Sequence, residues 1–173
     1  MMMISRTYVL NYLLTRSLQS FVTQALIALL AKLTKYGWFD SYEDEMVFRK
    51  TEQDVKVFLN GSMEHCLIGV KILSHLVSEM NQIAEMDVNL SFTKHRKIAC
   101  SFRDTQLFEI FILTCDLLTQ ARDGSNNYMI PENQQGLILE LLQLAKNCLS
   151  FDFIGTSADE STGEKPLALL NLR

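Results

Sequence analysis

Three histidines, four cysteines and one run of basic residues are the side chains of this 173-residue chain that could carry chemistry. His65 is followed directly by Cys66, and neighbours on a helix point in different directions, so the two make a poor metal pair. His75 lies away from the apolar positions around it, which is typical of a surface histidine. The sequence contains no HExxH, no phosphate-binding loop and no nucleophile elbow. These patterns predict no metal, no cofactor and no enzyme.

The cysteines, Cys66, Cys100, Cys115 and Cys148, are far apart in the sequence and form no CxxC pair. Most of them fall inside apolar helical patterns, where a free thiol acts as a small apolar side chain. We therefore expect free, buried thiols. A catalytic Cys–His pair stays open as an alternative, because its members need not be neighbours in the sequence.

The basic run is Lys94-His95-Arg96-Lys97. The net charge of −4 gives no global reason to expect nucleic acid, and no aromatic residues interleave with these charges as in single-strand binders. We expect a solvated helix start here, and the functional alternative is that Lys94, Arg96 and Lys97 contact an acidic surface of a protein partner. The acidic run 43–45 also has two interpretations: a solvated loop, or a contact with a partner's basic surface.

Helices must position these residues, because apolar residues recur with helical spacing and the chain has only 7 glycines and 2 prolines. Asp104 is expected to cap the fifth helix, and Pro131 to open the sixth. Six helices are predicted at about residues 6–15, 18–36, 51–60, 63–81, 105–121 and 131–149.

The second predicted helix illustrates the expected packing. Gly37 after its last turn suits a left-handed C-terminal position. Trp38 and Phe39 are expected to pack back onto the same helix, and the alternative is an exposed anchor for a partner. The face expected to be buried consists of Leu18, Phe21, Val22, Ala25, Leu29 and Leu33.

The helices fall into consecutive pairs. The second and fourth helices begin about 45 residues apart, which is the spacing of HEAT or armadillo repeats. We therefore expect an all-α superhelix of about three helix pairs over residues 1–155, followed by a disordered or divergent tail over 156–173. Periodicity alone also fits a closed bundle.

The first 39 residues contain no acidic side chain, so they also resemble a mitochondrial presequence. The apolar run 25–31 inside them is too short to span a membrane, and we expect no membrane insertion.

Several strings of the sequence resemble one family of known proteins, in the same order along the chain. That family is the exportin-7 and Ran-binding protein 17 family of importin-β-type nuclear transport receptors. Its pattern ends near Ser161, and the tail from Thr162 departs from it. The matching strings are 21–27, 37–40, 47–49, 93–99, 101–104, 147–155 and 158–161.

The resemblance implies a superhelix of HEAT repeats with no catalytic site. It implies three kinds of partner: the GTPase Ran in its GTP form, protein cargo, and nucleoporins. The location would be the nucleus and cytoplasm, at the nuclear pore. Family members are several times longer, so the resemblance implies an N-terminal fragment that lacks the opening repeat. A self-contained helical adaptor is the alternative function.

Overall fold

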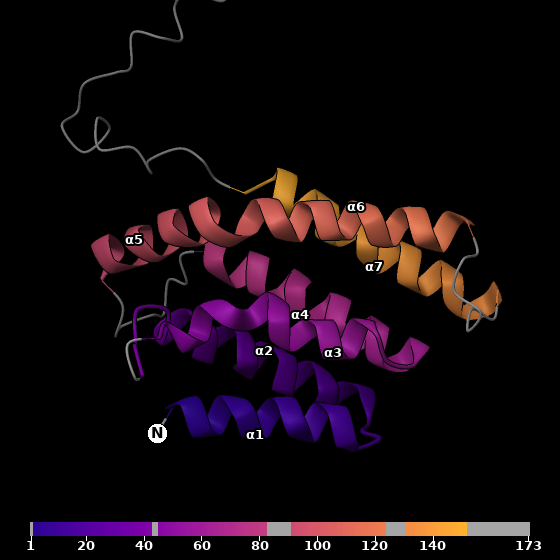
Figure 1. Cartoon of the computed structure of the whole chain (residues 1–173), viewed down its shortest axis with the longest axis horizontal. Helices are drawn as coiled ribbons and strands as arrows, with labels where there is room; N and C mark the ends of the chain where they lie inside the picture. Colours follow the sequence, from indigo (N-terminus) through magenta and orange to yellow (C-terminus); the bar gives the residue numbers. More distant parts are fainter. Residues whose placement is uncertain (1, 43–44, 83–90, 124–130, 152–173) are drawn as a thin grey trace, which may run out of the picture.

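A computed structural model describes residues 2–42, 45–82, 91–123 and 131–151 of the chain, and these residues form helices joined by short connections (Figure 1). The expected tail over 156–173 lies outside the described residues. The helices are α1 (Met2–Thr15), α2 (Ser20–Tyr36), α3 (Thr51–Leu59), α4 (Met63–Asn81), α5 (Phe92–Phe102), α6 (Phe108–Asp123) and α7 (Pro131–Leu149). Two short segments are 3-10 helical, η1 (Val47–Lys50), and π-helical, η2 (Arg103–Leu107).

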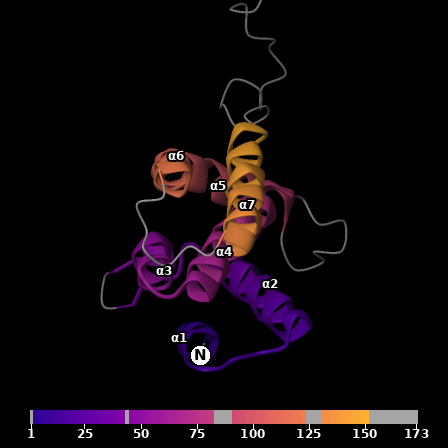
Figure 2. The same cartoon turned by 90° about the vertical axis from the view of Figure 1, so that its right-hand side faces the viewer.

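The helices stack as three successive pairs, α1 with α2, α3 with α4, and α6 with α7. The central helix is α4, which contacts α2 on one side and α7 on the other. Figures 1 and 2 place α1 at one end of the stack and the α6–α7 pair at the opposite end. This open arrangement confirms the expected helical-repeat stack, because a closed bundle would bring the first and last pairs together.

The central position of α4 follows from its two apolar sides. Val70, Leu73 and Val77 are buried on this helix, and Ile72 and Leu76 are buried as well, because two neighbouring helices cover it. Ser62 caps the helix, and its hydroxyl oxygen accepts a hydrogen bond from the backbone N–H of His65 at 3.3 Å. A Cβ at Gly69 would lie 3.0 Å from the Cβ of Phe58, so glycine lets α3 approach closely.

The predicted face of α2 is wrong. Phe21, Ala25 and Leu29 are exposed, while the helix buries Ile27, Leu30, Ala31 and Thr34. Apolar residues surround this helix on nearly every side, so periodicity alone cannot select the buried face. The selection comes from the contact with α4, which is a tertiary effect.

The predicted cap at Asp104 is also wrong. The helix begins earlier, at Phe92, and its cap is Ser91, whose hydroxyl oxygen accepts from the backbone N–H of Lys94 at 3.2 Å. Asp104 lies within η2, which joins α5 to α6. Buried Phe102 and Leu107 are five residues apart, so an α-helix would put them on different faces. The wider π-helical turn returns both to the core.

Two buried cations join neighbouring helices. The side chain of Lys35 is fully buried on α2, and its Nζ lies 3.2 Å from Glu79 Oε1 and 2.9 Å from the backbone oxygen of Gln82. Arg6 of α1 is buried beside Asp54 of α3, and the two side chains form an ion pair. Both cations come from the acid-poor start of the chain, where they stabilise the packing of helices.

Candidate functional site

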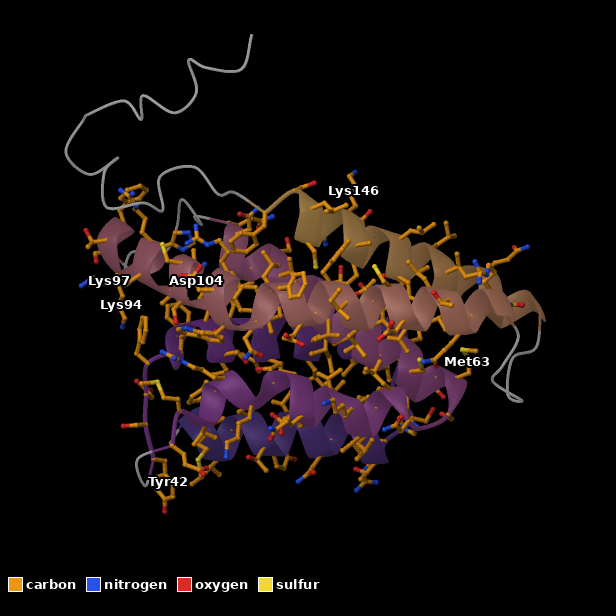
Figure 3. All side chains as sticks on the ribbon, turned by 45° about the horizontal axis from the view of Figure 1, so that its top comes forward. Tyr42, Met63, Lys94, Lys97, Asp104 and Lys146 are labelled. Atoms are coloured by element: carbon orange, nitrogen blue, oxygen red, sulfur yellow. The ribbon has the colours of Figure 1, made fainter. Side chains whose placement is uncertain are left out.

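The basic run lies in the first two turns of α5. Lys94 and Lys97 are exposed, His95 is buried, and Arg96 is half-buried with its guanidinium 5.8 Å from the centre of the Phe92 ring. A helix turns about 100° per residue, so Lys94 and Lys97 share one face while Arg96 lies on roughly the opposite side. Figure 3 shows Lys94 and Lys97 side by side at one end of the molecule, apart from Lys146 on α7. The structure therefore brings together two of the three expected residues.

The electrostatic setting of these lysines is positive. The first turn of α5 holds no acidic residue, and the N-terminus of a helix carries a partial positive charge. Cations at this position are slightly unfavourable for the helix itself. The helix end and the charges of Lys94 and Lys97 therefore add together, and the combined field attracts an anionic group on another molecule.

Trp38 lies beneath α5 rather than on its own helix, which corrects the expected packing. The indole is fully buried, its Nε1 donates to Ser101 Oγ at 3.0 Å, and its ring meets Phe102 edge-on with centroids 5.6 Å apart. Gly37 before it has a φ of −87°, so the expected left-handed conformation is also wrong. Glycine is needed there because a Cβ would lie 2.6 Å from the Phe48 ring.

Arg49 is a residue of this region that the sequence did not indicate. Its guanidinium carbon lies 5.6 Å from the centre of the Trp38 ring and 5.5 Å from that of the Phe39 ring. Ser101, the hydrogen-bond partner of Trp38, is one helical turn from Lys97 and on the same face. Arg49 is therefore joined through Trp38 to the lysine face of α5. No sequence signal reveals this, because the contact spans separate elements.

Of the acidic run 43–45, only Glu45 lies among the described residues. Glu45 is exposed and forms an ion pair with Lys50. The pair is at the surface, where water screens the charges and the contribution to stability is small. The alternative, that the run contacts a partner's basic surface, stays a prediction.

A pocket of about 320 Å³ lies between the start of α6 and the end of α7. Burial, and secondarily Cys115, raise the pKa of the Cys148 thiol to about 11, so this thiol stays protonated near neutral pH. A protonated thiol is a poor nucleophile, which makes catalysis by Cys148 unfavourable. All four cysteines are free, as expected, with Cys66 and Cys148 buried and the other two half-buried. The pocket is lined by Arg103, Leu107, Phe108, Phe111, Cys148 and Leu149.

The histidines have separate surroundings. His75 is exposed, which confirms the expectation from its position. His65 joins α4 to the end of α1, because its Nε2 donates to the backbone oxygen of Leu14 at 3.0 Å and its Nδ1 lies 2.9 Å from Ser62 Oγ. Within the described ranges, no three histidine, cysteine or acidic side chains gather in a way that could hold a metal ion. None of the helices in these ranges has the length and the apolar character needed to span a bilayer.

Comparison with known proteins gives strong matches over nearly the whole chain. The chain is 63% identical over 161 residues to Ran-binding protein 16 of Drosophila melanogaster, a match that covers 92% of this chain and 15% of that protein. It is 56% identical over 160 residues to Exportin-7-A of Xenopus laevis, and 49% identical to human Ran-binding protein 17. Each of these two matches covers 92% of this chain and 14% of the relative. No family model and no solved structure matches the chain.

These matches cover 92% of the chain. The strings of the sequence that resemble the family are likewise spread along most of the chain, from residue 21 to residue 161. The chain spans about a seventh of the length of these relatives, since the matches cover 14% to 15% of them. A stack of three helix pairs is also what a short piece of a helical-repeat protein should look like. By its sequence, the chain belongs to the exportin-7 family, and it spans about a seventh of the length of the relatives it matches.

Proposed function

We propose that the chain is part of a nuclear export receptor and that its helix pairs bind Ran in the GTP form. The observation that supports this most is the match over 92% of the chain to proteins named exportin-7 and Ran-binding protein. Protein cargo and nucleoporins are the other proposed partners. The proposed location is the nucleus and cytoplasm, with passage through nuclear pores.

Such a receptor works by coupled binding and needs no catalytic residue. If Ran-GTP and cargo bind two sites of one protein, each changes the affinity of the protein for the other by the same factor. A stack of helix pairs suits this role, because its long side surfaces can contact large partners. The proposed contribution of this chain is one part of the Ran surface.

Within the chain, we assign the Ran contact to Lys94 and Lys97. Both side chains are exposed on one face of α5, at the positive end of the helix. Arg96 is assigned a smaller part, because it is half-buried against Phe92. Complementary charge of this kind increases the association rate and guides the orientation of partners.

Replacing both lysines by glutamate tests this assignment. The Lys94→Glu, Lys97→Glu variant should bind Ran-GTP about tenfold more weakly than the unchanged chain, because like charges across an interface cost free energy. Lys146→Glu is the control, since Lys146 is exposed on α7 and apart from the lysine pair. Affinity is measured by titration at low and at physiological salt. Equal affinities of the double variant and the control would contradict the assignment.

A further inference from the structure

The Arg49 side chain is held in place by rings and has unused donors. Its guanidinium lies against both Trp38 and Phe39, and the side chain is half-buried. The Nε of Arg49 is buried and makes no hydrogen bond to any of the residues described here. Guanidinium presents its donors in a planar fork that suits a carboxylate. A buried donor without a hydrogen bond is uncommon in proteins, and the Nε of Arg6, whose guanidinium pairs with Asp54, shares this feature.

Three other cations of the same half of the chain have carboxylate partners. Arg6 pairs with Asp54, and Lys35 lies 3.2 Å from Glu79. Lys50, directly after Arg49, pairs with a glutamate of the preceding loop. Arg49 differs from these, because no carboxylate oxygen of the described residues lies within 4.0 Å of its nitrogens. Its charge is balanced by ring faces, which compensate a guanidinium only in part.

The support beneath Arg49 is rigid. Trp38 is fully buried, its Nε1 donates to Ser101 Oγ at 3.0 Å, and its ring packs edge-on against Phe102. The arginine is therefore ordered before any partner arrives, and binding costs little additional side-chain entropy. Phe39 beside it is 41% exposed, so an apolar surface borders the charge.

The residues around Arg49 decide which anion fits. Tyr42 and Met46 lie on the connection that leads to Arg49, and both are well exposed; the Met46 backbone oxygen accepts from the Arg49 N–H at 3.0 Å. Asp40 and Glu45 are exposed on the same connection, and their charges repel a long polyanion such as nucleic acid. A single carboxylate meets less of that repulsion than a polyanion does, and its apolar neighbours can pack on the Phe39 ring. This surface, formed by Trp38, Phe39, Tyr42, Met46 and Arg49, is called the Arg49 shelf below.

We propose that the Arg49 shelf binds one aspartate or glutamate side chain of a protein segment, flanked by apolar residues that pack on Phe39. The carboxylate accepts from the Arg49 guanidinium. Basic residues further along the segment would face Asp40 and Glu45. The proposal goes beyond Ran binding, because it specifies a recognition chemistry that any partner segment of this kind can satisfy.

The chain contains one tryptophan, and that residue is the floor of the shelf, so its fluorescence reports on binding. The probe is a nonapeptide with a central glutamate flanked by leucines and with lysines at both ends. Its twin has glutamine at the centre. We expect the glutamate peptide to produce a saturable change in Trp38 emission and to bind about tenfold more tightly than the glutamine peptide.

Arg49→Gln should remove this preference, and Lys50→Gln should keep it. Lys50 is the matched control, because it is the adjacent cation and already has a carboxylate partner. Emission typical of a buried indole in each variant shows that the fold is retained. Three results would overturn the proposal: no saturable change in the unchanged chain, equal affinity for the two peptides, or a preference that survives in Arg49→Gln. A stronger response to a single-stranded oligonucleotide than to the glutamate peptide would overturn it as well.

Discussion

Replacing Trp38 by alanine should lower the free energy of unfolding by about 3–5 kcal/mol, which is the usual cost of truncating a large buried aromatic side chain. The indole is fully buried and joins two distant parts of the chain, because it contacts Ser101 and Phe102 of α5. Its removal leaves a cavity beneath α5 and removes a hydrogen bond. A loss of this size is a large share of the stability of an ordinary domain.

The measurement is urea unfolding followed by far-ultraviolet circular dichroism, at a protein concentration low enough to limit association. Trp38→Phe should cost less than the alanine change, because phenylalanine fills most of the space but cannot donate to Ser101. Phe39→Ala is the control, with an expected loss below about 1 kcal/mol, since its ring is 41% exposed. Similar losses for Trp38→Ala and Phe39→Ala would contradict the account of Trp38 as the anchor of α5.

The chain alone should associate in solution through the α6–α7 end of the stack, and two charges placed there should weaken this association. Phe108 is 68% exposed and Leu149 is 71% exposed, and both line the apolar pocket between the two helices. Leu142 of α7 is 52% exposed. Exposed apolar surface of this extent at the end of a repeat stack is normally covered by a neighbour. Phe108→Glu with Leu149→Glu should therefore weaken association through this end, while the exposed Ile4 and Tyr8 of α1 are unchanged.

Sedimentation or light scattering over a range of concentrations checks this result. The control carries the same two added charges on exposed polar positions of the same region, Gln143→Glu with Ser150→Glu, and should associate like the unchanged chain. A monomeric unchanged chain that unfolds cooperatively would contradict this prediction. It would favour the alternative of a self-contained helical adaptor.

The sequence predicted the helices and their pairing because apolar spacing is a local property. It failed where a neighbour decides the outcome. In α2, apolar residues lie on nearly every side, and only the contact with α4 buries Ile27 and Leu30 while leaving Phe21 exposed. The segments α5, η2 and α6 follow one another without a gap, but the five-residue step between Phe102 and Leu107 breaks the α-helical spacing of apolar residues. The sequence therefore predicted that the helix begins only after Asp104, which lies within η2.

The candidate site was predictable in part for the same reason. The basic run is visible in the sequence, and helical geometry would have separated Lys94 and Lys97 from Arg96 if the start of α5 had been placed correctly. Arg49 could not be found in this way. Its position depends on Trp38, which is held by a residue 63 positions further along the chain. Contacts of that range are set by tertiary packing rather than by local pattern.

We propose that this chain carries part of the Ran-binding surface of an export receptor. The most direct test is a titration of the purified chain with Ran loaded with a non-hydrolysable GTP analogue, and separately with GDP. We expect binding to the GTP-analogue form that is at least about tenfold tighter than binding to the GDP form. Equal affinity for the two forms, or no binding to either, would contradict the claim for this chain.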